Sequence, residues 1–207
     1  MFDPGLIDMI MALRSRGVSD NLLLRAMELC PRKDFVATDH YERAYLEQAL
    51  PIACGQTLSS PMNIALMTLM LEVGPDHKVL EIGTGSGYHA AILSHLCKRV
   101  YTVERYHALL AGAEAQFKKL GLVNIVSNHG DGRYGWPGQS PFDRIIVTCG
   151  LRSKPRRLLK QLAPEGMLIA EIDGHLTRLV KQGVKVVETK FTPLSLPIVE
   201  NGKSKVL

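Results

Sequence analysis

Hydrophobic residues recur every three or four positions early in the chain, which predicts helices, whereas short apolar runs alternate with helical segments after residue 75. Leu6, Ile10 and Leu13 lie one helical turn apart, and residues 34–58 show no regular period. Gly17 is predicted to end the first helix. Ser19 or Asp20 can cap a second helix, which runs to Cys30 and is ended by Pro31. A third helix is predicted to begin with Ser60 as its cap and Pro61 at its first position. Residues 1–75 are therefore predicted to form a helical N-terminal extension.

Strand-like and helix-like segments alternate from residue 78 onward. Strands are predicted over 78–82, 99–103, 124–128, 142–148 and 167–172, with helices over 88–96, 108–120 and 156–162. Two further strands, 176–181 and 184–191, meet at a turn and predict an antiparallel hairpin. The alternation indicates an α/β, Rossmann-like fold, a mostly parallel twisted sheet with helices on both faces. We expect one domain over 1–207, with residues 76–207 as the sheet core.

Composition and charge narrow the class of protein. Of the 207 residues, 46% are hydrophobic and 22% charged, which excludes a disordered tail or a fibrous protein. The net charge of +5 is spread along the chain, so acidic partners are favoured slightly and nucleic acid is not expected. No apolar run approaches the roughly 18 residues that span a bilayer, and the N-terminus lacks the basic start of a secretory signal. We expect a monomer in the cytoplasm, without a membrane partner.

The cysteines point away from a metal site. Cys30, Cys54, Cys97 and Cys149 are widely separated and form no C-x-x-C pair, so no metal is expected. Each lies in an apolar stretch and is typical of a small buried hydrophobic residue. Free thiols of this kind fit a reducing compartment.

A glycine-rich loop follows the first predicted strand of the sheet. Residues 79–88 read VLEIGTGSGY, so an apolar strand runs into Gly83, Gly85 and Gly87 just before a helix. Such glycines let the backbone approach a ligand closely, and the helix start offers free N–H groups to an anion. A dinucleotide fingerprint needs a glycine five positions after Gly83, where Tyr88 stands. The pattern therefore favours a smaller anion, such as the carboxylate of an amino-acid-like cofactor.

Acidic residues follow the same strands at positions that suit the rest of such a cofactor. Glu81, two residues before the first glycine, can meet a cationic amine. Glu104 ends the second strand, where a carboxylate can accept hydrogen bonds from ribose hydroxyls. Asp131 follows the third strand and can meet an adenine amino group. Amine, carboxylate, ribose and adenine together describe S-adenosylmethionine. The alternative is that the glycines only shape a turn and the acids are solvated.

Several longer segments carry a specific likeness to one family. Residues 43–61 (RAYLEQALPIACGQTLSSP), the glycine loop, residues 101–105 (YTVER) and residues 130–148 (GDGRYGWPGQSPFDRIIVT) stand in the family's order. Over roughly residues 6–148 the chain resembles protein-L-isoaspartate O-methyltransferases, which methylate the carboxyl group of isoaspartyl residues in damaged proteins and peptides. The resemblance implies a class I methyltransferase fold that uses S-adenosyl-L-methionine.

The resemblance also implies site residues. Ser59 falls on the hydroxyl that orients the substrate, and Thr57 lies in the same segment. The expected cofactor-binding residues are Glu81, Gly83, Thr84, Gly85, Gly87, Glu104, Asp131 and Gly132. An isoaspartyl carboxylate, with a reference pKa near 3.9, is already an ionised nucleophile, and a sulfonium methyl group is already activated. The reaction therefore needs no general base and no metal, only placement, desolvation and a hydrogen bond to the carboxylate.

The chain departs from the family's pattern after Thr148. Residues 149–175 differ from the segments expected beside the substrate, which leaves two alternatives open: a methyltransferase for another carboxylate or small molecule, or a cofactor-binding homologue with little isoaspartyl activity. The departing region carries a basic cluster of Arg152, Lys154, Arg156, Arg157 and Lys160. The cluster is either a solvated surface or a binding site for acidic peptides or other anions.

Overall fold

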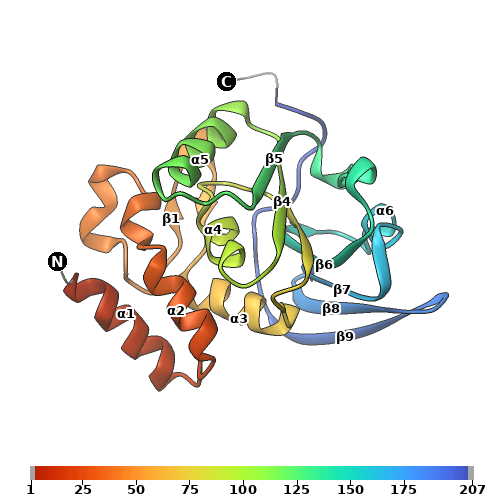
Figure 1. Cartoon of the computed structure of the whole chain (residues 1–207), viewed down its shortest axis with the longest axis horizontal. Coiled ribbons are helices and arrows are strands. Elements are labelled where there is room, and N and C mark those ends of the chain that lie inside the picture. The colour runs from red at the N-terminus through yellow and green to blue at the C-terminus, as the bar shows by residue number, and fades with distance from the viewer. Residues whose placement is uncertain (1–2, 205–207) are drawn as a thin grey trace.

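The computed structural model describes residues 3–204, and Figure 1 shows a helical N-terminal part beside a twisted sheet. The helices are α1 (Pro4–Ser15), α2 (Asn21–Leu29), α3 (Pro61–Leu71), α4 (Tyr88–Ser94), α5 (His107–Lys119) and α6 (Arg156–Leu159). The strands are β1 (Leu50–Pro51), β2 (Thr57–Leu58), β3 (Lys78–Ile82), β4 (Arg99–Glu104), β5 (Ile125–His129), β6 (Phe142–Leu151), β7 (Leu162–Ile172), β8 (His175–Gln182) and β9 (Lys185–Pro193). The predicted order of elements is confirmed.

The predicted caps start the helices. The Asp20 carboxylate, rather than Ser19, accepts a hydrogen bond from the amide of Leu23 at 2.9 Å and caps α2. Ser60 caps α3, with Pro61 at the first helical position. These side chains satisfy backbone N–H groups that have no partner inside the helix, which fixes where each helix begins.

The main sheet has seven strands in the order β5-β4-β3-β6-β7-β8-β9. The strands from β5 to β7 run parallel, and β8 and β9 form the predicted antiparallel hairpin at one end. The chain moves outward from β3 in one direction and then returns to β6 on its other side. The carboxyl ends of β3 and β6 therefore flank a topological switch point, where ligands bind in open α/β sheets.

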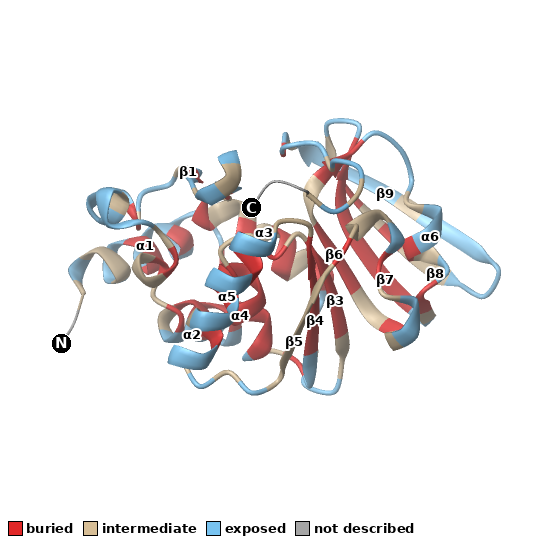
Figure 2. Ribbon diagram, turned by 90° about the horizontal axis from the view of Figure 1, so that it is seen from above, coloured by how far each residue is buried: buried red, intermediate tan, exposed pale blue. Residues whose placement is uncertain are grey.

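The two faces of the sheet are covered unequally. One hydrophobic core contains side chains from the helices α1, α2, α3, α4 and α5, together with side chains of the sheet such as Val79, Val100 and Ile169. The second core, which contains Leu80, Ile145 and other residues of the opposite face, includes α6 through Leu158. Figure 2 shows most helices on one side of the buried central strands and α6 beyond the other side. The N-terminal helices and the sheet thus share a core.

The prediction of a helix over residues 156–162 is wrong in length, because α6 ends at Leu159 and β7 begins at Leu162. The reason lies in the side chain of Gln161. Its amide nitrogen donates to the carbonyl of Tyr134 at 2.8 Å, and its oxygen accepts from the amide of Trp136 at 2.8 Å. The Gln161 carbonyl accepts from Phe142 at the start of β6, which draws the chain directly into the sheet.

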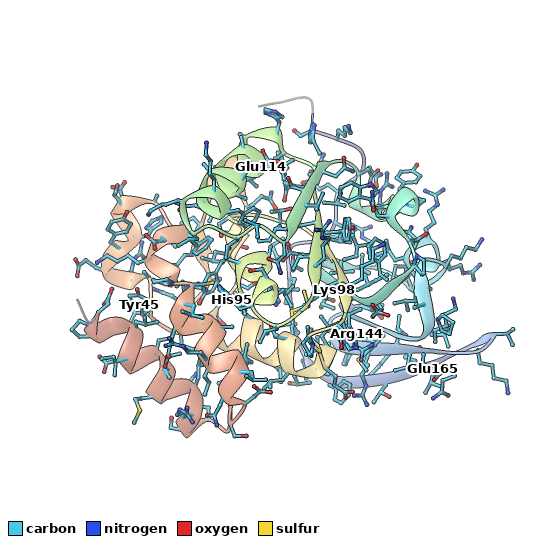
Figure 3. All side chains as sticks on the ribbon, in the orientation of Figure 1. Tyr45, His95, Lys98, Glu114, Arg144 and Glu165 are labelled. Carbon is cyan, nitrogen blue, oxygen red and sulfur yellow. The ribbon has the colours of Figure 1, made fainter. Side chains whose placement is uncertain are left out.

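Side chains also tie helices to strands. Arg144, at the start of β6, donates to the carbonyl of Glu72 after α3 at 3.1 Å. Glu114 on α5 accepts a hydrogen bond from Ser127 on β5. Figure 3 labels Arg144 and Glu114, which lie on different parts of the fold. Across residues 3–204, no helix combines the length and apolar character needed to cross a membrane.

Candidate functional site

A cavity lies at the carboxyl edge of the sheet, at the switch point between β3 and β6. Four regions form it: the segment around β2, the loops after β3, β4 and β5, the carboxyl-terminal part of β6, and the end of the chain. Among the residues predicted to bind substrate or cofactor, the cavity is lined by Thr57, Ser59, Gly83, Gly85, Glu104 and Gly132. The structure therefore brings the substrate-orienting and cofactor-binding candidates to one place.

The glycine loop after β3 is fixed by its neighbours. Gly83 has a φ of +96°, and a Cβ atom there would lie 2.5 Å from the Thr148 hydroxyl oxygen. That hydroxyl donates to the carbonyl of Gly83 at 2.7 Å, so β6 holds the loop from one side. Only glycine fits this close approach and backbone conformation. Gly87 is instead the N-cap of α4 and lies outside the lining of the cavity.

Glu104 links the glycine loop to the turn after β4. One carboxylate oxygen accepts from the amide of Gly85 at 2.9 Å, and the other accepts from the amides of Arg105 at 2.7 Å and Tyr106 at 3.0 Å. The side chain is buried but lines the cavity. The oxygen that accepts only from Gly85 has a further lone pair, so Glu104 can still accept a hydrogen bond from a ribose hydroxyl.

Glu81 lies behind the loop rather than on the cavity. It is fully buried, and one of its oxygens accepts from the Thr102 hydroxyl at 2.6 Å. Thr102 in turn bonds Thr84 at 2.6 Å, while the other Glu81 oxygen has no protein partner. Burial raises the pKa of Glu81 to about 8, and nearby Glu104 adds to the rise. Glu81 and Thr84 thus support the loop from inside the protein.

Asp131 follows β5 and stands next to Gly132 of the cavity wall. Its carboxylate accepts from the Arg133 guanidinium at 2.6 Å and from the amide of Gly202 at 2.9 Å. Burial raises the pKa of Asp131, but the hydrogen bonds from Arg133 and Gly202 outweigh this effect and lower it overall. Asp131 is therefore an ionised carboxylate next to the cavity wall.

A buried arginine positions the segment that carries Ser59. Arg32 is fully buried, and it donates to the carbonyl of Ser59 at 2.6 Å and to that of Gln48 at 3.1 Å. Burial lowers its pKa to about 10, so it stays charged at neutral pH. Sequence reasoning missed this residue, because nothing in the helical spacing distinguishes Arg32 from a surface cation.

The end of the chain forms a wall that sequence reasoning also missed. We call residues 194–204 the C-terminal strap. The strap leaves β9 with the amide of Leu194 donating to the carbonyl of Gly174 at 3.0 Å. It then crosses the end of β6, where Gly150 donates to Pro197 and accepts from Val199, both at 2.8 Å. Figure 1 shows this dark blue segment running from β9 up to the region of β5 and α5.

Arg105 anchors the far end of the strap. Its side chain donates to the carbonyls of Asn201 and Gly202, both at 3.2 Å, and forms an ion pair with Glu200. The amide of Ser204 donates to the carbonyl of Arg105 at 3.0 Å. The strap thereby closes the cavity above the turn after β4. The one sequence signal was Arg105 itself, within the segment 101–105.

The described residues offer no metal site, and the one cysteine that lines the cavity carries a neutral thiol. Within the part of the chain that the structure describes, no group of three His, Cys, Asp or Glu residues could hold a metal ion. All four cysteines are free thiols. Cys149 lines the cavity, and burial raises its pKa to about 12, so the thiol is neutral there at physiological pH.

Comparisons with known proteins agree with the geometry. The family model for protein-L-isoaspartate(D-aspartate) O-methyltransferase matches residues 7–199, so the likeness continues well past residue 148. A protein-L-isoaspartate O-methyltransferase of Maricaulis maris is 44% identical and covers 99% of this chain and 98% of its own length. One of the same name from Paracoccus denitrificans is 53% identical over 79% of this chain and 76% of its own.

Solved structures show the same fold. A structure named protein-L-isoaspartate O-methyltransferase has a TM-score of 0.87 and 25% identity, covering 95% of this chain and 66% of that chain. A second, described as a putative protein-L-isoaspartate O-methyltransferase from Plasmodium falciparum in complex with S-adenosyl-L-homocysteine, has a TM-score of 0.81 and 20% identity. It covers 93% of this chain and 97% of that chain.

Proposed function

The chain belongs to the protein-L-isoaspartate O-methyltransferase family, and we propose that it methylates the carboxyl group of L-isoaspartyl residues in damaged proteins and peptides, with S-adenosyl-L-methionine as methyl donor. One observation carries the proposal most strongly. Ser59 and Thr57 line the same cavity as Gly83, Gly85 and Glu104. A substrate carboxylate held at Ser59 would therefore lie beside a cofactor bound over the glycine loop.

The residues present fit the cofactor. Gly83 and Gly85 line the cavity without side chains, which lets a ligand approach the backbone closely, and the backbone of this loop suits the cofactor's carboxylate. Glu104 would accept hydrogen bonds from the ribose, and Asp131 with Gly132 would receive the adenine. Glu81 and Thr84 support the loop from behind. When bound, the cofactor supplies a methyl group activated by a positively charged sulfur.

The chain's own task is to bind and orient. The Ser59 hydroxyl donates a hydrogen bond to one oxygen of the substrate carboxylate, which leaves the other oxygen free to attack. Apolar neighbours such as Ile52, Val103 and Ile198 exclude water from the cavity, which strengthens that hydrogen bond. With the cofactor bound, the free carboxylate oxygen would form its bond to the methyl group as the sulfur–methyl bond breaks, and the electron pair would return to sulfur. No proton is transferred, so the cavity needs no general base.

Methyl transfer to matched peptides tests this proposal. One peptide contains isoaspartate and the other contains normal aspartate in the same sequence, with labelled S-adenosylmethionine as donor. We expect labelling of the isoaspartyl peptide alone. Ser59→Ala should lower kcat about ten- to hundredfold, as expected for the loss of one hydrogen bond to a charged group, while cofactor affinity stays unchanged. Ser15→Ala, an exposed serine at the end of α1, is the matched control.

Other outcomes select the alternatives. Labelling of neither peptide, with cofactor binding confirmed by calorimetry, favours another carboxylate substrate or a homologue that binds the cofactor with little turnover. An unchanged rate in Ser59→Ala contradicts the role given to the hydroxyl. That the protein is a monomer remains a prediction, which sedimentation tests. That it works in the reducing cytoplasm is a second prediction, which the four free thiols support and cell fractionation tests.

A further inference from the structure

A second, larger cleft adjoins the cofactor cavity. It encloses about 1140 Å³ and lies between α6, the turn that follows β6, the loop after β5 and the C-terminal strap. Pockets for small ligands usually measure about 300–1,000 Å³, so this cleft has room for a peptide segment. The two cavities share a wall formed by Ile82, Gly132 and the strap residues 198–200.

The cleft is strongly basic. Its lining contains five cations and a single acid among the described residues: Arg133, Arg152, Lys154, Arg156 and Arg157, with Glu200. Some of these charges are compensated, because Arg133 pairs with Asp131, Lys154 with Glu188, and Glu200 with Arg105.

Three cations remain without a carboxylate partner within 4.0 Å among residues 3–204: Arg152, Arg156 and Arg157. Arg152 and Arg156 are exposed. The Arg157 guanidinium lies over the ring of Tyr134 at 4.2 Å, which holds it in place. The cleft therefore presents an excess of positive charge next to the site of methyl transfer.

The lining favours an acidic peptide over a nucleic acid. Single-stranded nucleic acids bind through bases stacked on aromatic side chains, and no aromatic residue lines the cleft among the described residues. The ring of Tyr134 already lies under the guanidinium groups of Arg133 and Arg157. Carboxylates on an extended peptide need only the cations.

We propose that this basic cleft binds acidic side chains that flank the isoaspartyl residue, an inference that rests on the proposed function. The enzyme then prefers damaged segments rich in Asp and Glu. Because the two cavities share lining residues, they lie next to each other. A peptide with its isoaspartate at Ser59 then passes the strap and places its flanking residues in the cleft. The cleft thus determines specificity, while the cofactor cavity carries the reaction.

Two isoaspartyl peptides test the proposal, one flanked by Glu and the other by Gln at the same positions. The variant is Arg152→Glu with Arg156→Glu. The matched control is Lys98→Glu with Arg99→Glu, two exposed cations at the amino end of β4, whereas the cleft lies at the carboxyl edge of the sheet. Figure 3 labels Lys98. Both double variants change the net charge of +5 by the same amount.

We expect the wild-type ratio of kcat/KM for the acidic over the neutral peptide to be about ten, in the range of a few exposed ion pairs. The ratio should fall to about one in the cleft variant, mainly through KM, and should stay near ten in the control. Equal ratios in wild type and cleft variant, or an equal fall in the control, overturn the proposal.

A binding measurement separates this proposal from the proposed function. Fluorescence anisotropy of the two labelled peptides reports on the cleft even without turnover, so failure of methylation leaves the cleft testable. Preferential binding of the acidic peptide that is lost in the cleft variant supports the proposal. No preference in binding contradicts it, and so does tighter binding of a single-stranded oligonucleotide that competes with the acidic peptide.

Discussion

Two walls of the cofactor cavity are built in opposite ways. The glycine-loop wall, residues 82–87 with Glu104, is held by side chains that are almost fully buried, such as Glu81, Thr84 and Glu104 itself. The C-terminal strap, which forms the facing wall, buries only Leu196 and exposes most of its other residues. The first wall lies within the protein core, and the second lies on its surface.

The difference separates two tasks. Buried hydrogen bonds resist local opening, whereas segments with few buried contacts and exposed hydrogen bonds open at low free-energy cost. The glycine-loop wall is thus suited to fix the geometry of the methyl donor. The strap is suited to open while the rest of the fold stays intact, which gives cofactor and product a route of exchange.

The largest effect is expected from Glu104→Ala in the glycine-loop wall. The substitution leaves the amides of Gly85, Arg105 and Tyr106 without their acceptor. Because these donors are only partly buried, each lost acceptor costs about 1 kcal/mol, the low end for an unpaired donor, so the free energy of unfolding should fall by about 3 kcal/mol. Cofactor affinity should fall about a hundredfold if Glu104 holds the ribose as proposed, because a hydrogen bond to a charged group is then lost as well. Urea unfolding and calorimetry measure the two quantities.

Glu200→Ala in the strap is the matched control. It also removes a carboxylate, but one that is 60% exposed and pairs with Arg105. A surface ion pair contributes about 0–1 kcal/mol, so the free energy of unfolding should change little. Equal losses in the two variants contradict the contrast between the walls.

The glycine-loop wall could be predicted from the sequence, whereas the C-terminal strap could not. The strand, glycine and helix pattern of the glycine-loop wall lies within about ten consecutive residues, so local rules predict it. The strap depends on contacts over long separations: Gly202 and Asp131 are 71 residues apart, and Arg105 and Gly202 are 97 apart. Patterns of period two or 3.6 carry no information on such pairings.

The same reason explains two other differences. The resemblance identified Ser59, but not Arg32, which holds its backbone across 27 residues. The apolar residues after Arg156 predicted a longer helix, and only the tertiary contacts of Gln161 show why the chain turns into β7 there. The helix propensity of a segment does not decide its structure where a side chain or strand that is distant in the sequence forms hydrogen bonds with the same backbone.

An effect that depends on pH is expected from Glu81→Gln behind the glycine loop. The pKa of Glu81 is raised from 4.5 to about 8 in the folded protein. Between these values the folded state binds a proton that the unfolded state releases, so stability falls as pH rises, by at most about 1.4 kcal/mol per pH unit. The glutamine variant lacks this group and should lose less stability between pH 5 and pH 8.

Urea unfolding of both proteins at pH 5 and pH 8 measures the difference. All other titrating groups are common to the two proteins, so subtracting one pH dependence from the other isolates Glu81. Identical pH dependences contradict a neutral Glu81 in the folded protein.

The smallest effect is expected from loosening the strap. Arg105→Ala removes the side chain that holds Asn201, Gly202 and Glu200, and a chain that ends at Val199 removes those partners instead. Each lost surface contact is worth about 1 kcal/mol or less, so cofactor affinity should fall by about fivefold. Most of the change should lie in a faster dissociation rate, measured by stopped-flow fluorescence, with the free energy of unfolding nearly constant.

Arg105 also lines the cavity, and the shortened chain controls for this contact. A faster dissociation in Arg105→Ala alone identifies Arg105 as a direct cofactor contact, whereas the same change in both variants identifies the strap as the wall that opens.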